Sequence, residues 1–102
     1  MVAEIIQRKA EVIELCRLHH VRRLEVFGSA AGSGFDSERS DFDFLVEFES
    51  LPPGTYATTF FDLKEALESL LGRSVDLVVG SAVRNPWFRK GIEQNKALLY
   101  AA

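Results

Sequence analysis

The sequence predicts an α/β domain (α+β in the stricter sense), with a small mixed β-sheet and helices packed on one face. Two observations lead to this fold class. Apolar residues recur at steps of three and four in two long stretches, whereas polar and apolar residues alternate in a shorter one. The elements follow one another as helix, strand, turn, strand, helix, strand, helix and strand. We expect residues 1–102 to form one domain, because 102 residues support a single hydrophobic core.

Composition excludes several classes of function. Twelve Lys and Arg against 15 Asp and Glu give a net charge of −3, which argues against broad nucleic-acid binding. No apolar run approaches the roughly 20 residues that span a membrane, and the first residues do not resemble a signal peptide. The single cysteine, Cys16, cannot form an internal disulfide, which indicates a reducing compartment such as the cytoplasm.

The first two elements are a helix and a strand. Residues 2–19 predict one amphipathic helix, whose apolar stripe includes Val2, Ile6, Ala10, Ile13 and Cys16. On this stripe Cys16 is interpreted as a buried apolar residue and not as a catalytic thiol. Residues 21–27 predict the first strand, and the turn at Gly28 follows it directly.

The second strand is the part of the sequence most informative about function. Residues 41–48 alternate between polar and apolar side chains, which predicts a strand with two different faces. Asp41 and Asp43 lie on one face, about 7 Å apart along the backbone. Phe42 and Phe44 lie on the other face, where we expect helices to bury them.

Two carboxylates so close together repel one another unless a cation lies between them. Mg²⁺ prefers one or two carboxylates together with substrate phosphates. The small-residue turn at residues 28–34 lies just upstream, and such turns allow a phosphate to approach the backbone closely. The pattern alone leaves two interpretations open, a metal–nucleotide site and a solvated acidic face.

A second helix and a third acid follow. Residues 56–71 predict a helix with a buried leucine stripe, and Gly72 is placed to end it. The strand at residues 74–79 then carries Asp76 among valines and leucines. A carboxylate there is costly to bury without a partner, so a metal shared with the first acids is favoured.

The last elements are a helix and a short strand. Asn85 and Pro86 predict a helix start, because proline fits the first turn. We expect Trp87, Phe88 and Ile92 to pack inward, followed by a final strand at residues 96–100.

These residues resemble a known family. Gly-Ser followed a dozen residues later by Ser-Asp-x-Asp is similar to the nucleotidyltransferase signature of the DNA polymerase beta superfamily. The chain is most similar to minimal nucleotidyltransferases (MNT proteins), antitoxins that are often paired with HEPN-domain toxins. The matching positions are Gly28, Ser29, Ser40, Asp41 and Asp43. Asp76 fits the third carboxylate of the family, and the resemblance covers nearly the whole chain.

The resemblance implies a polymerase beta-like nucleotidyltransferase fold and a catalytic site. Asp41, Asp43 and Asp76 are expected to be the catalytic residues and to hold two Mg²⁺ ions. The side that binds the nucleotide phosphates is expected to include Gly28, Ser29 and Ser40. ATP is the expected substrate.

The same resemblance implies transfer of AMP from ATP to a protein partner, as in the antitoxins that modify a tyrosine of a HEPN ribonuclease toxin. Two alternatives remain open: a binding module that neutralises such a toxin by contact, and a nucleotidyltransferase acting on a small molecule. One departure bears on activity. Family members commonly carry Arg-Gly where this chain has Gly32 and Ser33, which removes one cation from the turn.

Overall fold

The computed structural model describes residues 1–31 and 41–102. The helices are α1 (Ala3–Gln7), α2 (Lys9–Leu18), α3 (Tyr56–Leu71) and α4 (Pro86–Gln94). The strands are β1 (Val21–Phe27), β2 (Phe42–Phe48), β3 (Val75–Val79) and β4 (Lys96–Ala101). Two short 3₁₀ helices follow strand ends, η1 (Gly28–Ala31) after β1 and η2 (Gly80–Ala82) after β3. No helix in the described part is long and apolar enough to cross a membrane.

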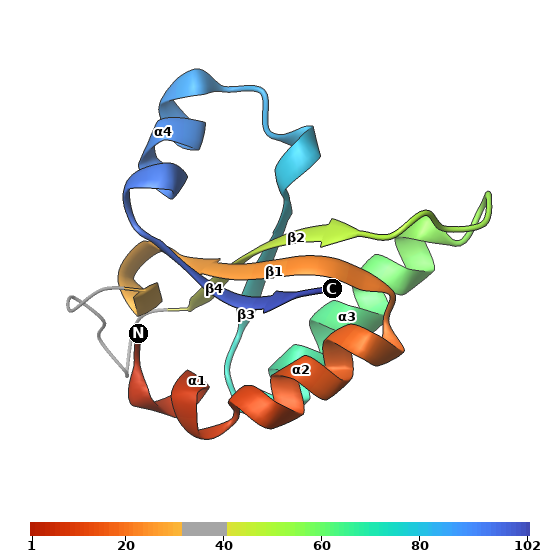
Figure 1. Cartoon of the computed structure of the whole chain (residues 1–102), viewed down its shortest axis with the longest axis horizontal. Helices are drawn as coiled ribbons and strands as arrows, with labels where there is room; N and C mark the ends of the chain where they lie inside the picture. Colours follow the sequence, from red (N-terminus) through yellow and green to blue (C-terminus); the bar gives the residue numbers. More distant parts are fainter. Residues whose placement is uncertain (32–40) are drawn as a thin grey trace.

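The four strands form one mixed sheet in the order β3-β2-β1-β4, which confirms the predicted fold class. β1 pairs with β2 and with β4 in antiparallel fashion, whereas β2 and β3 are parallel. The parallel pair is connected by α3, which crosses one face of the sheet (Figure 1). The two central strands are therefore β1 and β2, and β2 is the strand that carries the alternating acids.

The hydrophobic core lies between the sheet and the helices α1, α2 and α3. Phe42 and Phe44 are fully buried there, which confirms the predicted apolar face of β2. They meet Leu63 and Leu67 of α3 and Cys16 of α2 within one cluster. Figure 1 shows α2 and α3 side by side under this face. The other face of the sheet, here called the open face, carries Asp43 and Asp76 together with apolar residues such as Phe27 and Leu45.

Helix α3 ends as the sequence predicts. Gly72 adopts a left-handed conformation with φ of 65° and directs its N–H to the carbonyl of Glu68. Glycine reaches this conformation without steric cost, so it terminates the helix efficiently. The strand β3 begins three residues later, and Val75 N–H donates to the Glu68 carboxylate at 3.0 Å.

The prediction of one helix over residues 2–19 is wrong. The helix breaks at Arg8, whose N–H donates to the carbonyl of Ile5, three residues back, at 3.2 Å. This tighter turn separates α1 from α2 and rotates the first segment. Ile5 is consequently buried, whereas Ile6, expected on the apolar stripe, is 56% exposed.

The prediction that Trp87 and Phe88 pack inward is also wrong in large part. Helix α4 lies on the other side of the sheet from α1–α3 (Figure 1), and Trp87 is 80% exposed. Phe88 is 47% exposed, although its ring meets Phe27 edge-on. Only Ile92 is buried as expected. A nine-residue helix that covers just one end of the open face cannot bury all of its aromatic side chains.

Candidate functional site

Two of the three expected acids are direct neighbours on the open face. Asp43 of β2 and Asp76 of β3 are register partners in the parallel pairing. Both lie opposite the buried face, because their neighbours Phe42, Phe44 and Val75 are in the core. Adjacent strands are about 4.8 Å apart, so the two carboxylates occupy one small region.

Asp41 lies immediately before β2 and is exposed. Burial, together with the charges of Asp76 and Asp41, raises the pKa of Asp43 above its ordinary value. Asp76 and Asp41 are therefore both close enough to act on Asp43 electrostatically. Ionised Asp43 is destabilised in this environment, which a bound cation would reverse.

The described residues do not form a three-ligand metal site. Across residues 1–31 and 41–102, no three side chains of His, Cys, Asp or Glu lie close enough together to hold a metal ion, so Asp41, Asp43 and Asp76 are not brought together as one group of three ligands. Mg²⁺ does not need such a group, since it usually binds one or two carboxylates and completes its shell with water and substrate phosphates. The Asp43–Asp76 pair, with Asp41 beside it, fits that mode of binding.

The turn after β1 closes against the acids. Gly28 has a φ of +68°, and a Cβ built on it would lie only 2.7 Å from Asp43 Oδ2. Glycine is therefore required for two reasons, the left-handed backbone and the close approach of the carboxylate. The predicted turn at Gly28 is confirmed and forms the helix η1. The expectations that concern the Ser29 side chain and residues 32–40, which include Gly32 and Ser40, lie outside the described structure.

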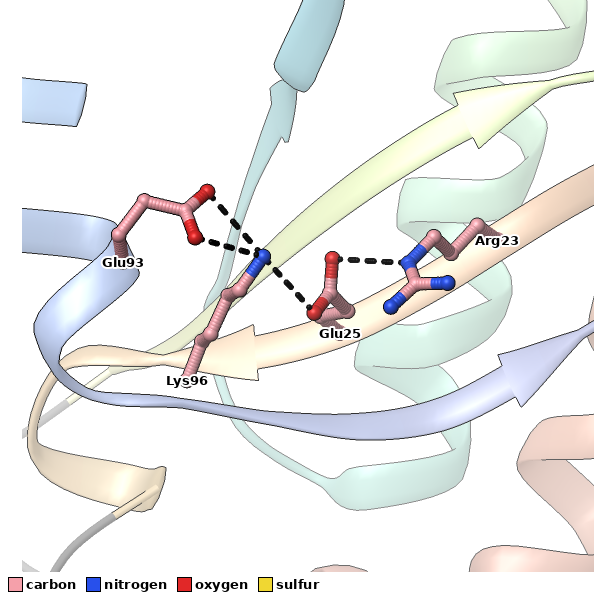
Figure 2. A network of polar contacts seen from close by, with 4 residues as sticks. All are labelled: Arg23, Glu25, Glu93 and Lys96. Carbon is pink, nitrogen blue, oxygen red and sulfur yellow. Dashed lines mark hydrogen bonds and ion pairs between the residues drawn. The ribbon is translucent and has the colours of Figure 1, made fainter.

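Sequence reasoning missed a charged network on the same face. Glu25 of β1 has a side chain only 6% exposed, and its carboxylate contacts Arg23 Nε at 3.1 Å and Lys96 Nζ at 3.3 Å. Lys96 Nζ also contacts Glu93 at 3.1 Å, so the network joins β1, β4 and α4 (Figure 2). Burial alone would raise the pKa of Glu25, but hydrogen bonds and charges from Arg23 and Lys96 outweigh it and lower the pKa. The sequence offers one signal for this network: Glu25 is an acid between the apolar residues Leu24 and Val26 near the end of β1.

The acids do not line the hollow found on the helix side of the molecule. That cavity, of about 210 Å³, is bordered by residues of α1 and α3 and the adjoining turn: Glu4, Gln7, Arg8, Leu70 and Leu71. The candidate site lies instead on the open face, at the end of β1 and the starts of β2, β3 and β4.

Comparison with known proteins agrees with this arrangement. Residues 10–100 match the family model described as a nucleotidyltransferase domain. The protein adenylyltransferase MntA of Thermococcus cleftensis is 43% identical over 72 residues, which cover 71% of this chain and 69% of that protein.

Solved structures give the same result for the fold. A structure provisionally described as a minimal nucleotidyltransferase has a TM-score of 0.73 and 36% sequence identity, covering 91% of this chain and 90% of that one. A second structure contains a tri-AMPylated HEPN toxin of Shewanella oneidensis in complex with an MNT antitoxin. Its matched chain is 18% identical with a TM-score of 0.66, covering 95% of this chain and 72% of that one. At that identity the second match shows a shared fold.

Proposed function

This chain belongs to the nucleotidyltransferase-domain family, and we propose that it transfers AMP from ATP to a hydroxyl group of a protein partner. The observation that carries the proposal is the pairing of Asp43 with Asp76 on the open face. With Asp41 nearby, the pair forms an acidic patch suited to a divalent cation and phosphates. The name of the Thermococcus relative, a protein adenylyltransferase, supports this class of reaction.

Mg²⁺ is the proposed cation, with Asp41, Asp43 and Asp76 as its ligands and two ions as the expected number. When bound, Mg²⁺ would neutralise phosphate charge and favour in-line displacement at phosphorus. The pKa of Asp43, raised by burial and by the charges of Asp76 and Asp41, supports this assignment, because a bound cation would favour the ionised carboxylate.

The residues of the chain have distinct roles in this scheme. Asp76 is proposed to help accept the proton of the acceptor hydroxyl as its oxygen attacks the α-phosphorus of ATP. The bond from that phosphorus to the bridging oxygen breaks, so that AMP remains on the acceptor and pyrophosphate leaves. Gly28, Ser29 and Ser40 are proposed to hold the β- and γ-phosphates of the leaving group.

The proposed acceptor is a tyrosine of a HEPN-domain toxin, which makes this chain an antitoxin. Support comes from the solved complex of an AMPylated HEPN toxin with an MNT antitoxin of the same fold. The exposed position of the acids on the open face also suits a large acceptor. The reaction is proposed for the cytoplasm, which agrees with the free, buried thiol of Cys16.

One observation favours a second candidate, in which the chain silences its partner by contact alone. Gly32 stands where family members commonly carry arginine, so this position does not supply a cation. In this second candidate, the chain keeps its fold and the surface that contacts the partner, whereas AMP transfer is weak.

Co-expression with the neighbouring gene product, followed by incubation with ATP labelled at the α-phosphate, tests both candidates. We expect label on a tyrosine of the partner, dependent on Mg²⁺ and lost in Asp43→Asn. A stable complex without label would favour neutralisation by contact. Label on an added small alcohol but never on the partner would point instead to a small-molecule nucleotidyltransferase.

A further inference from the structure

The carbonyl group of Gly28 is held by a side chain from the far end of the chain. Asn95 Nδ2 donates a hydrogen bond to Gly28 O at 2.9 Å, across 67 residues of sequence. Gly28 is thus enclosed by two partners, the Asn95 amide at its carbonyl and the Asp43 carboxylate at its Cα. The start of η1 is fixed relative to the acidic patch from both sides.

Asn95 is itself anchored. It ends α4, and its N–H donates to the carbonyl of the buried Ile92 at 3.2 Å. The next residue, Lys96, connects to the buried Glu25 of β1 and to Glu93 of α4 (Figure 2). We call Glu93, Asn95 and Lys96 the α4–β4 junction. Its attachment to β1 through Glu25 gives Asn95 a defined position, even though its side chain is exposed.

A second contact joins α4 to the same end of β1. The ring of Phe88 meets that of Phe27 edge-on, with centroids 6.2 Å apart. Phe27 immediately precedes Gly28, so Phe88 of α4 and its C-cap Asn95 contact two successive residues at the end of β1. Aromatic pairs of this geometry add to the stability of the contact.

The hydrogen bond from Asn95 to the Gly28 carbonyl also orients the neighbouring amide group. The described chain contains no cis peptide bond, so the C=O of Gly28 and the N–H of Ser29 point in opposite directions from one planar unit. A donor at this carbonyl fixes the direction of that N–H. It also polarises the peptide, which makes the N–H a stronger donor.

We infer that Asn95 is a positioning residue for phosphate binding: its hydrogen bond to Gly28 sets the Ser29 N–H toward the phosphates of the nucleotide bound at Asp43 and Asp76. This role rests on the proposed function, since it concerns the same substrate. It assigns to the α4–β4 junction a part in nucleotide affinity, separate from the three acids.

The test compares two asparagines at opposite ends of α4. Asn95→Ala and the size-matched Asn95→Leu remove the donor to Gly28. The matched control is Asn85→Ala, which removes the helix cap formed by Asn85 Oδ1 with the N–H groups of Trp87 and Phe88 and does not touch η1. Affinity is measured by calorimetry with α,β-methylene ATP and Mg²⁺, because this analogue cannot release AMP.

Both Asn95 variants are expected to bind the analogue about three- to tenfold more weakly, the loss that corresponds to one hydrogen bond. Asn85→Ala is expected to lower the Tm while its affinity stays within about twofold of the unchanged protein. In the nucleotide-free protein, the NMR resonance of the Ser29 amide should move in both Asn95 variants and stay in place in Asn85→Ala.

Equal affinity of the unchanged protein and both Asn95 variants would overturn the positioning role. So would a loss of affinity as large in Asn85→Ala, because that would trace the effect to the stability of α4. Failure of the unchanged protein to bind the analogue would refute the proposed nucleotide site itself, and the inference with it. The Ser29 resonance separates these cases, because it reports the Asn95–Gly28 bond without any nucleotide.

Discussion

Asp43 and Asp76 face the same side of the sheet as direct partners in its one parallel strand pair. The pairing brings two carboxylates close together, and their mutual repulsion costs free energy when both are ionised. Burial and the charges of Asp76 and Asp41 raise the pKa of Asp43, which is a direct sign of this cost.

Replacing Asp43 by asparagine should separate chemistry from folding. Asp43→Asn keeps the size of the side chain and removes the charge, so AMP transfer should fall by orders of magnitude. Without metal, the Tm should hold or rise, because repulsion with Asp76 is relieved. Labelled-ATP transfer and thermal unfolding in a chelator measure the two effects. Normal transfer by a folded variant would place the metal site elsewhere.

Metal affinity should fall in mildly acidic solution. Because the pKa of Asp43 is raised in the folded state, protons compete with Mg²⁺ at higher pH than at an ordinary aspartate. The same shift means that ionised Asp43 lowers stability near neutral pH, and that this penalty shrinks as pH falls below the folded pKa and is gone below the unfolded pKa. Titration of Mg²⁺ by calorimetry between pH 4 and 7 checks the first effect. A pH-independent affinity would contradict it.

Adding a methyl group at Gly28 should abolish transfer. Gly28→Ala strains a backbone with φ of +68° and drives the new Cβ toward Asp43 Oδ2. Gly72→Ala is the matched control, with φ of +65° and no atom within 4 Å of the new Cβ. Both should lose about 1–2 kcal/mol of stability from the left-handed backbone, but only Gly28→Ala should lose transfer. Loss of transfer in both would show that general destabilisation is responsible.

The buried face of β2 should carry the stability of the fold. Phe44→Ala empties a fully buried site in the core cluster, and we expect a loss of about 3–5 kcal/mol. Phe61→Ala, at a ring 57% exposed on α3, should cost below about 1 kcal/mol. Urea unfolding measures both variants. Similar losses would mean that the strand faces are assigned wrongly.

The Glu25 network should contribute stability with a defined pH dependence. The pKa of Glu25 is lowered by Arg23 and Lys96, so its contribution is present above the unfolded pKa and is lost as pH falls through the folded value. Glu25→Gln should therefore reduce the free energy of unfolding at pH 7 and reduce it less at pH 3. A difference between the two proteins that does not change with pH would show that the charge of Glu25 is unimportant.

Much of this fold follows from local patterns. The alternation from Asp41 to Phe48 predicted both faces of β2, because a strand has a period of two. The ends of α3 were predicted at the correct residues, since the apolar stripe stops at Gly72. Asp76 lies on the open face for the same reason as Asp43, because it alternates with the buried Val75 and Leu77.

The remaining features depend on contacts between distant parts of the chain. The burial of Glu25 is stabilised by Lys96, and the turn at Gly28 is held by Asn95, so neither could be read from a nearby pattern. The break at Arg8 occurs without proline or glycine, and its apolar spacing is that of a continuous helix. The exposure of Trp87 follows from where α4 lies relative to the sheet, which the helix itself does not encode.

The alternation along β2 also determines how tolerant neighbouring positions are to sequence change. From Phe42 to Glu47, each residue faces either the helices or the open side, and its neighbour faces the opposite way. Substitutions in the first set act on the packing of the core, whereas substitutions in the second set act on the surface around Asp43. The two properties can therefore change independently along one strand, although their residues are adjacent in the sequence.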